Sequence, residues 1–355
     1  MISIKFNSQA SSIPSDCAHG RIPLSYSVFR SHQTHYLALK VMNSVRIALL
    51  GAQHDYAQGL FPLIARSLGY SISWTKPADA DLLIYGAFYK PNSKPYRWLP
   101  KPLRSTAVNL EQKLNSRKIK PLTLFHTCES LRHDVFKTDY SISFDLGVQN
   151  PNHLRLPYWM ELVDWSHEGI TGNTNPRYGE LLSLQKMQAS LGNAFLSRPQ
   201  KAAMITSHLL EPRKMLFDAV DKSIGVQGFG SCFNHSIKNH HQSNFEKRAL
   251  LQEFAFNLCP ENHLFPGYYT EKIPESFLSG ALPLGWVDAN VCADFNPGAF
   301  INLEPMAWEN FESLTGLLQS KKYLESFCDQ SLLLKQPSLE PAKVFIGEIL
   351  KKAAH

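Results

Sequence analysis

Apolar and polar residues alternate with strand and helix spacing from about residue 44 onward. Residues 45–51 form a short, mostly apolar run, interrupted by Arg46, that ends in glycine, which predicts a buried strand. The preceding residues, 1–43, are rich in polar side chains and have few periodic apolar positions. Because Met42 stands just before the first strand, we expect residues 1–43 to be either a variable N-terminal tail or a misassigned start.

Two blocks of alternating patterns follow. In the first block, helix spacing covers residues 57–68, and strand-like runs cover 81–85, 122–127 and 140–144. In the second block we expect helices at 212–223, 245–253 and 271–280, and strands at 202–206, 254–258, 282–286 and 300–303. This alternation predicts βα units on mainly parallel sheets, so the expected fold class is α/β.

A run of turn-forming residues at 166–180 separates the two blocks and predicts a linker. We therefore expect an N-terminal domain at 44–165, a C-terminal domain at 181–335 and a terminal helix within 336–355. With 355 residues, of which 44% are hydrophobic, the chain exceeds what a single core usually supports. In tandem α/β units of this kind, ligands gather in a cleft at the carboxyl ends of the strands.

The formal net charge of +6 allows an anionic small substrate, an anionic lipid surface or nucleic acid as partner. Lysines and arginines are spread along the chain rather than gathered in one arm, which disfavours nucleic acid. No segment approaches the roughly 18 to 20 apolar residues of a membrane span, and the first residues lack the apolar core of a secretory signal. We expect a cytoplasmic protein whose basic charge permits peripheral contact with a membrane.

Six cysteines lie far apart, without a Cys-x-x-Cys pair, and this spacing disfavours zinc clips and redox dithiols. We expect reduced thiols in the core. Cys232, His235, His240 and His241 resemble a metal cluster, but a solvated polar loop fits them better because a second cysteine is missing. The pair Asp79 and Asp81 superficially matches the metal-binding Asp-x-Asp signature of some transferases, and we interpret it as a turn that leads into a strand.

The segment 256–272 carries the most informative chemistry. An apolar strand opens into a loop of polar and aromatic residues, and Thr270 stands where it can cap a helix with Glu271 and Lys272 in its first turn. Free amides at a helix start, beside a lysine, suit a diphosphate. An ordinary strand–loop–helix junction remains the alternative from the pattern alone.

Within this region, Leu-Cys-Pro-Glu-Asn at 258–262 and Gly-Tyr-Tyr-Thr-Glu-Lys at 267–272, continued by 277–284 and 294–302, closely resemble the donor-site signature of α-1,3/4-fucosyltransferases, glycosyltransferase family 10. Segments 125–130, 139–145 and 155–158 resemble the acceptor domain of that family, and 205–213 is a weaker third match. The resemblance spans about residues 120–303. It implies the GT-B fold, with two Rossmann-like domains facing across a cleft.

The resemblance implies an inverting transfer of L-fucose from GDP-fucose to a hydroxyl of a glycan acceptor that contains N-acetylglucosamine, in α-1,3 or α-1,3/4 linkage. It points to Glu129 as the base and to Arg213 and Lys272 as partners of the diphosphate. The residues expected to contact ribose and fucose hydroxyls are Asn262, Tyr268 and Glu271. Glu261 is a structural candidate, and Tyr269 and Phe265 are expected to pack.

With two cations at the leaving group, the expected reaction requires no metal or other cofactor. Departures from the family pattern at Pro260, His263 and Cys128 leave the acceptor open. Loops at 88–100 and 126–137 are expected to select the acceptor. Two alternatives stay open: a GT-B transferase with another nucleotide sugar, and an inactive homologue that binds glycans or anions.

Overall fold

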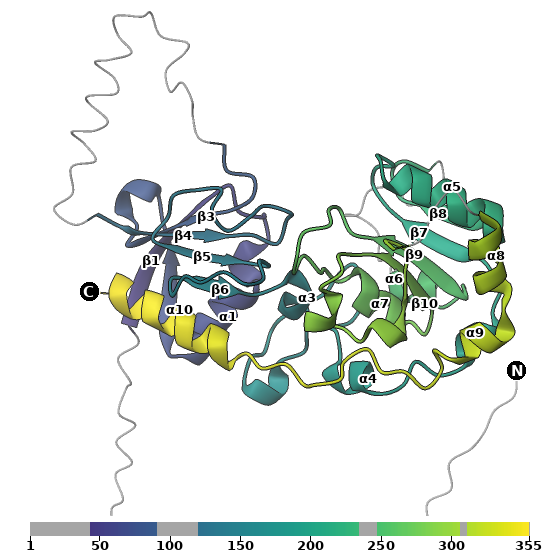
Figure 1. The fold of residues 1–355 in the computed structure, drawn as a ribbon. Coiled ribbons are helices and arrows are strands. Elements are labelled where there is room, and N and C mark those ends of the chain that lie inside the picture. The colour runs from purple at the N-terminus through teal and green to yellow at the C-terminus, as the bar shows by residue number, and fades with distance from the viewer. Residues whose placement is uncertain (1–42, 91–119, 234–246, 306–310, 355) are drawn as a thin grey trace, which may run out of the picture. The chain divides into compact units, whose positions relative to one another are not determined.

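The computed structural model describes residues 43–90, 120–233, 247–305 and 311–354 (Figure 1). Predictions for residues 1–42, for most of the 88–100 loop and for His235, His240 and His241 lie outside these ranges. Two parallel sheets organise the described chain, as the alternating patterns predict. None of the helices in these ranges is long and apolar enough to cross a membrane.

The first sheet has six parallel strands in the order β2-β1-β3-β4-β5-β6. Strand β1, the second in this order, buries Val45, Ile47 and Ala48 of the mostly apolar run seen in the sequence. The six strands are β1 (Asn43–Leu50), β2 (Tyr70–Trp74), β3 (Leu82–Tyr85), β4 (Leu122–His126), β5 (Tyr140–Ser143) and β6 (His153–Arg155).

Helix α1 (Leu60–Ser67) supplies an apolar face to the core of this sheet, and a short 3-10 turn (Tyr56–Gln58) precedes it. The C-terminal helix α10 (Glu340–Ala353), yellow in Figure 1, returns to α1 and β6. There the Nζ atom of Lys352 donates to the hydroxyl of Tyr140 at 2.7 Å. The end of the chain therefore completes the core around its first sheet.

Short helices occupy the segment between the sheets, which the sequence presented mainly as turns. They are α3 (Tyr158–Glu161), a 3-10 turn (Ser166–Glu168) and α4 (Leu184–Gln188). Lys343 of α10 pairs with Glu168 at 2.8 Å, so this connection is tied to the C-terminal helix.

The second sheet has five parallel strands in the order β11-β10-β9-β7-β8. Its strands are β7 (Ala202–Ile205), β8 (Val226–Phe229), β9 (Phe256–Pro260), β10 (Leu282–Trp286) and β11 (Ile301–Asn302). Every residue of β9 is buried, including the polar Asn257 within its mostly apolar run. The helices around it are α5 (Arg213–Ile224), α6 (Lys247–Leu251), α7 (Lys272–Leu278), α8 (Phe311–Gln319) and α9 (Lys321–Glu325).

Two expectations need correction. The five cysteines in the described ranges are free thiols, but Cys259 alone among them is buried, so they are not a set of core residues. Thr270 does not cap α7, because the helix begins at Lys272 and Glu271 occupies the N-cap position. The Thr270 hydroxyl instead bonds to Glu261.

Candidate functional site

A buried carboxylate fixes the loop between β9 and α7. Glu261, 1% exposed, accepts hydrogen bonds from the backbone N–H of Thr270 at 2.7 Å and from its hydroxyl at 2.8 Å. The Nζ atom of Lys272 donates to the same carboxylate at 2.8 Å and lies 2.6 Å from the Thr270 hydroxyl. Glu261 is thus structural, as proposed from the sequence, and it positions the ammonium group of Lys272.

Arg213 is the first residue of α5, directly after Pro212, as the sequence predicts. Its guanidinium is 8% exposed and donates to the side-chain oxygen of Asn262 and, at 3.2 Å, to the Thr206 hydroxyl. Nε2 of His208 lies 2.9 Å from Nη1 of Arg213. These partners are neutral, so Arg213 retains a charge that can act on a ligand.

Arg213 and Lys272 line the same pocket, at the carboxyl ends of β7 and β9. Thr206 and Asn257 contribute polar groups to its wall, and Lys247 adds a third cation. The carboxyl ends of parallel strands are where ligands of such sheets usually bind. The pocket therefore combines an expected location with positive side chains suited to a diphosphate.

Lys247, which the sequence interpretation missed, is the first residue of α6 in the described chain. Its ammonium pairs with Glu275, which is 1% exposed and also accepts from Nδ2 of Asn175 at 3.1 Å. Burial, together with the nearby Glu271 carboxylate, raises the pKa of Glu275 against the opposing effect of Lys247. A lysine in the first turn of a predicted helix was the available signal, the same one that singled out Lys272.

Glu271 lies between the two lysines. Burial disfavours its charged form, but Lys272, Lys247 and its own backbone N–H outweigh burial and lower the pKa of Glu271 to about 2. The carboxylate is therefore ionised at neutral pH, when it can accept hydrogen bonds but cannot donate one.

Tyr268 is more buried than expected for a residue that contacts a ligand at an open surface. It is 3% exposed, and its ring meets Phe144 edge-on at 4.8 Å. Neighbouring Gly267 has φ +90°, and a Cβ there would lie 2.3 Å from the Phe144 carbonyl oxygen. This close approach explains why glycine stands in the donor-like motif.

Arg155 of β6 joins the same loop to Asp294 by a hydrogen bond and an ion pair. Arg155 donates through both terminal nitrogens to Asp294 at 2.9 Å, and one of them also reaches the Gly267 carbonyl at 3.3 Å. Nε1 of Trp159 donates to Asp294 at 2.9 Å. The segments 155–158 and 294–302, which resemble family motifs, are therefore in direct contact.

Glu129 lies in the turn after β4 and is half-buried. Its backbone N–H donates to the Thr127 hydroxyl at 3.0 Å. Burial, with the carboxylates of Glu261 and Glu129, raises the pKa of Tyr268 despite the opposing charge of Lys272. Glu129 thus lies within electrostatic range of the donor-like loop, while its role as base stays a prediction.

The Asp79 and Asp81 pair is a turn that leads into a strand, as interpreted from the sequence. A 3-10 turn (Pro77–Asp79) precedes β3, and Asp81 accepts from the backbone and the guanidinium of Arg46. The packing expectation also holds for Tyr269, which is 1% exposed and donates its hydroxyl to Asp288 at 2.7 Å.

Known fucosyltransferases are similar to this chain in sequence and in fold. Residues 196–330 match the model for glycosyltransferase family 10 (fucosyltransferase), C-terminal. The alpha-(1,3)-fucosyltransferase FucT of Helicobacter pylori is 28% identical over 222 residues, which are 57% of this chain and 44% of that protein. The chain spans less than half the length of the curated relatives it matches.

Solved structures give the fold. A crystal structure of alpha1,3-fucosyltransferase with GDP-fucose superposes with a TM-score of 0.61 at 20% identity, covering 89% of this chain and 93% of that one. The structure with GDP gives 0.59 at 21% identity, covering 89% and 92%. The protein has the two-sheet fold of GT-B glycosyltransferases, as predicted. Residues 196–330 match the C-terminal model of glycosyltransferase family 10, and the resemblance to its fucosyltransferases is confirmed.

Proposed function

We propose that this protein is an inverting α-1,3 or α-1,3/4 fucosyltransferase that moves L-fucose from GDP-fucose to a hydroxyl of an N-acetylglucosamine-containing glycan. The observation that carries the proposal is the pocket shared by Arg213 and Lys272 at the carboxyl ends of β7 and β9. Two similar proteins, an alpha-(1,3)-fucosyltransferase and an alpha1,3-fucosyltransferase whose structure contains GDP-fucose, support the same donor.

In this proposal the bond between the fucose anomeric carbon and the β-phosphate oxygen breaks as the acceptor oxygen bonds to the opposite face of that carbon. The transition state resembles an oxocarbenium ion, as in glycoside hydrolysis. Glu129 takes the proton of the acceptor hydroxyl, and the electron pair of the broken bond leaves with GDP. A general base of this kind contributes roughly 10²–10⁴-fold to rate.

The charge that develops on GDP falls to Arg213 and Lys272, with Lys247 behind them. Side-chain cations fixed before the reaction stabilise a leaving group without reorganising. Lys272 is fixed by Glu261, and Arg213 is fixed by Thr206 and Asn262. We propose that these side chains neutralise the diphosphate without a metal ion bound to it.

Asn262 and Glu271 are the proposed partners of the ribose and fucose hydroxyls, and the ionised Glu271 suits acceptance from a sugar hydroxyl. Tyr268 is proposed to complete this wall, its phenol being held against Phe144. The acceptor is proposed to be a glycan, with contact to an anionic membrane surface permitted by the net charge of +6.

Donor competition tests the proposal. GDP and GDP-fucose should raise the unfolding temperature of the protein, because a ligand that binds the native state stabilises it, whereas UDP should not. Protection by UDP alone would instead support a transferase with another nucleotide sugar.

Turnover separates the proposed enzyme from an inactive anion-binding homologue. The protein is incubated with GDP-fucose and a panel of N-acetyllactosamine-type acceptors, and released GDP is measured. Activity that the Glu129→Gln variant lacks supports the proposal. GDP release no faster than in that variant, across all acceptors, contradicts it.

A further inference from the structure

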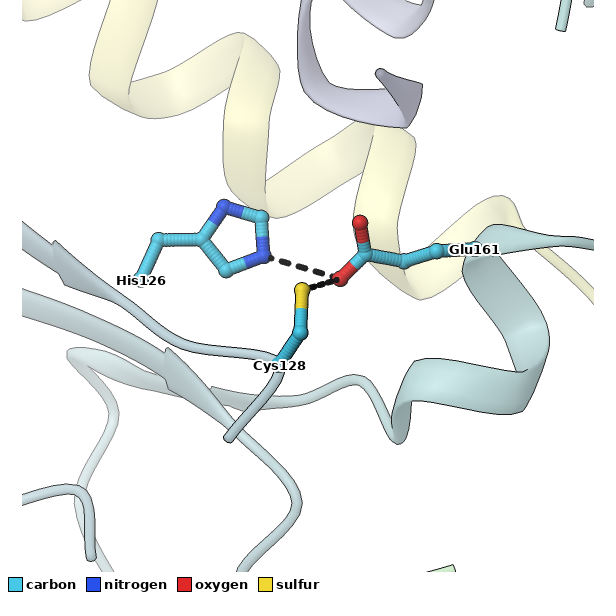
Figure 2. A group of neighbouring side chains, drawn as sticks. All are labelled: His126, Cys128 and Glu161. Carbon is cyan, nitrogen blue, oxygen red and sulfur yellow. Dashed lines mark hydrogen bonds and ion pairs between the residues drawn. The ribbon is translucent and has the colours of Figure 1, made fainter. Parts of the chain in front are cut away.

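Three side chains with metal-binding atoms meet where β4 ends beside α3 (Figure 2). Nε2 of His126 lies 3.2 Å from Oε1 of Glu161, and the Cys128 thiol donates to the same oxygen at 3.0 Å. All three ligand atoms lie within 4.8 Å of one another. His126 is 3% exposed, and the Glu161 side chain is 12% exposed, so the group is shielded from solvent.

The local charge around this group is negative. Within the part of the chain that the structure describes, the Glu161 carboxylate bonds to the imidazole of His126 and the thiol of Cys128, and to no lysine or arginine. The carboxylates of Glu161, Glu129 and Asp55 all act on Cys128. His126 can pair with the Glu161 carboxylate only when the imidazole is protonated, and a bound cation would supply a permanent counter-charge to this shielded group.

The three ligand atoms are close enough together to converge on one tetrahedral ion. Zinc bonds of about 2.0–2.3 Å to N, O and S atoms place neighbouring ligand atoms about 3.3–3.6 Å apart. The 3.2 and 3.0 Å contacts to the Glu161 oxygen therefore need to widen by a few tenths of an ångström, and the separation between Nε2 of His126 and Sγ of Cys128, which lies within 4.8 Å, needs to reach the same range. The hydroxyl of Tyr56 lies 2.7 Å from Nδ1 of His126 and fixes the ring plane, as partners of metal-binding histidines do.

From this arrangement we propose that His126, Cys128 and Glu161 bind one zinc ion through Nε2, Sγ and a carboxylate oxygen. Binding exchanges the thiol proton for a sulfur–metal bond, so one proton leaves for each ion bound. The thiolate and the carboxylate then balance the two charges of the ion. Three protein ligands leave a fourth position open, and thiolate with imidazole favours zinc over magnesium or calcium.

This site is distinct from the proposed diphosphate pocket, where the positive charge comes from Arg213, Lys272 and Lys247. Glu129 directly follows Cys128, so the ion would also restrain the turn that carries the proposed base. Zinc binding itself does not depend on the fucosyltransferase proposal. It can therefore be measured on the protein without substrate.

The full chain, stripped with a chelator, is titrated with Co²⁺ and then with Zn²⁺. We expect one ion per chain by elemental analysis, an intense near-ultraviolet thiolate-to-cobalt band, and displacement of cobalt by zinc. Cys128→Ser should abolish the band and weaken zinc binding at least tenfold. Glu161→Gln, which leaves His126 and Cys128 intact, should weaken zinc binding by a similar factor. Near-ultraviolet circular dichroism reports whether each variant is folded.

The matched controls are Cys292→Ser and Cys232→Ser, which remove exposed thiols outside the group. Both should keep the band and the affinity for zinc. The proposal is overturned by three results: no stoichiometric binding, a band that survives in Cys128→Ser, or a band that disappears in Cys232→Ser. The last result would assign the metal to the segment that begins at Cys232.

Discussion

Lys272 and Glu261 allow donor binding and folding stability to be separated by mutation. In Lys272→Met the cation is lost while most of the side-chain volume stays. The Glu261 carboxylate, 1% exposed, then keeps its bonds from Thr270 but loses its counter-charge. We expect this variant to bind GDP more weakly and to unfold at a lower temperature.

The size of each effect follows from the contacts. A hydrogen bond to a charged group contributes about 1.5–3 kcal/mol, which corresponds to about 10- to 100-fold weaker GDP binding. Removing one partner of a buried ion pair costs about 3–5 kcal/mol, and the lower end applies here. The Lys272 side chain is still 21% exposed, so water partly compensates for its loss. At about 2–4 °C per kcal/mol, the unfolding temperature should fall by about 6–12 °C.

The double variant Glu261→Gln, Lys272→Met separates the two effects. Replacing a buried ion pair with uncharged side chains of similar volume is often neutral for stability, so the unfolding temperature should recover. GDP affinity should stay low, because the cation is still absent. Calorimetric titration with GDP and a thermal melt of each variant provide the measurements. GDP affinity within about twofold of the parent in Lys272→Met, or restored in the double variant, would refute the role of Lys272.

Other variants test the remaining assignments. Glu129→Gln should lower kcat by about 10²–10⁴-fold in the GDP-release assay with unchanged GDP affinity; a purely structural role would move both. Lys247→Met should weaken GDP binding about tenfold by calorimetry, whereas Lys214→Met, an exposed cation beside Arg213, should leave it unchanged. Equal losses in both would indicate a general charge effect. Burial and the nearby His133 lower the pKa of His153 from 6.5 to about 4, so the unfolded chain binds the extra proton between these pH values. The free energy of unfolding should fall by about 1–3 kcal/mol as the pH falls through this window. Urea unfolding at several pH values should show that the free energy of unfolding of His153→Gln depends less on pH than that of the parent.

The sheets were predictable where apolar runs are long enough to specify a strand. The run at 45–51 and the buried run before Glu261 became β1 and β9. Three short strands were missed, namely β2, β6 and β8. In β6 a single residue, Leu154, is buried, and in β8 the side chain of Phe233 occupies the space beside Gly228. Such strands are specified by their neighbours in the sheet rather than by their own pattern.

The site shows the same limit. Motif resemblance marked Arg213 and Lys272, and the structure brings both to one pocket. Lys247 was missed because its significance depends on Glu275, a carboxylate 28 positions later in the chain. The cap predicted at Thr270 was wrong because the buried Glu261 takes its hydroxyl. Local propensity cannot anticipate competition from a distant side chain.

The charges in the pocket are paired unequally, and from this pairing we expect the proposed diphosphate to be held mainly by one side chain. Lys272 is paired with Glu261, Lys247 with Glu275, and Glu271 acts on both lysines. Part of each lysine's field is therefore already neutralised by carboxylates. The hydrogen-bond partners of Arg213 are neutral, and its planar guanidinium can hold two phosphate oxygens at once. Glu261 and Glu271 also act on Arg213, but neither is its hydrogen-bond partner, so under the proposed function we expect Arg213 to be the first side chain to meet the charge of the departing GDP.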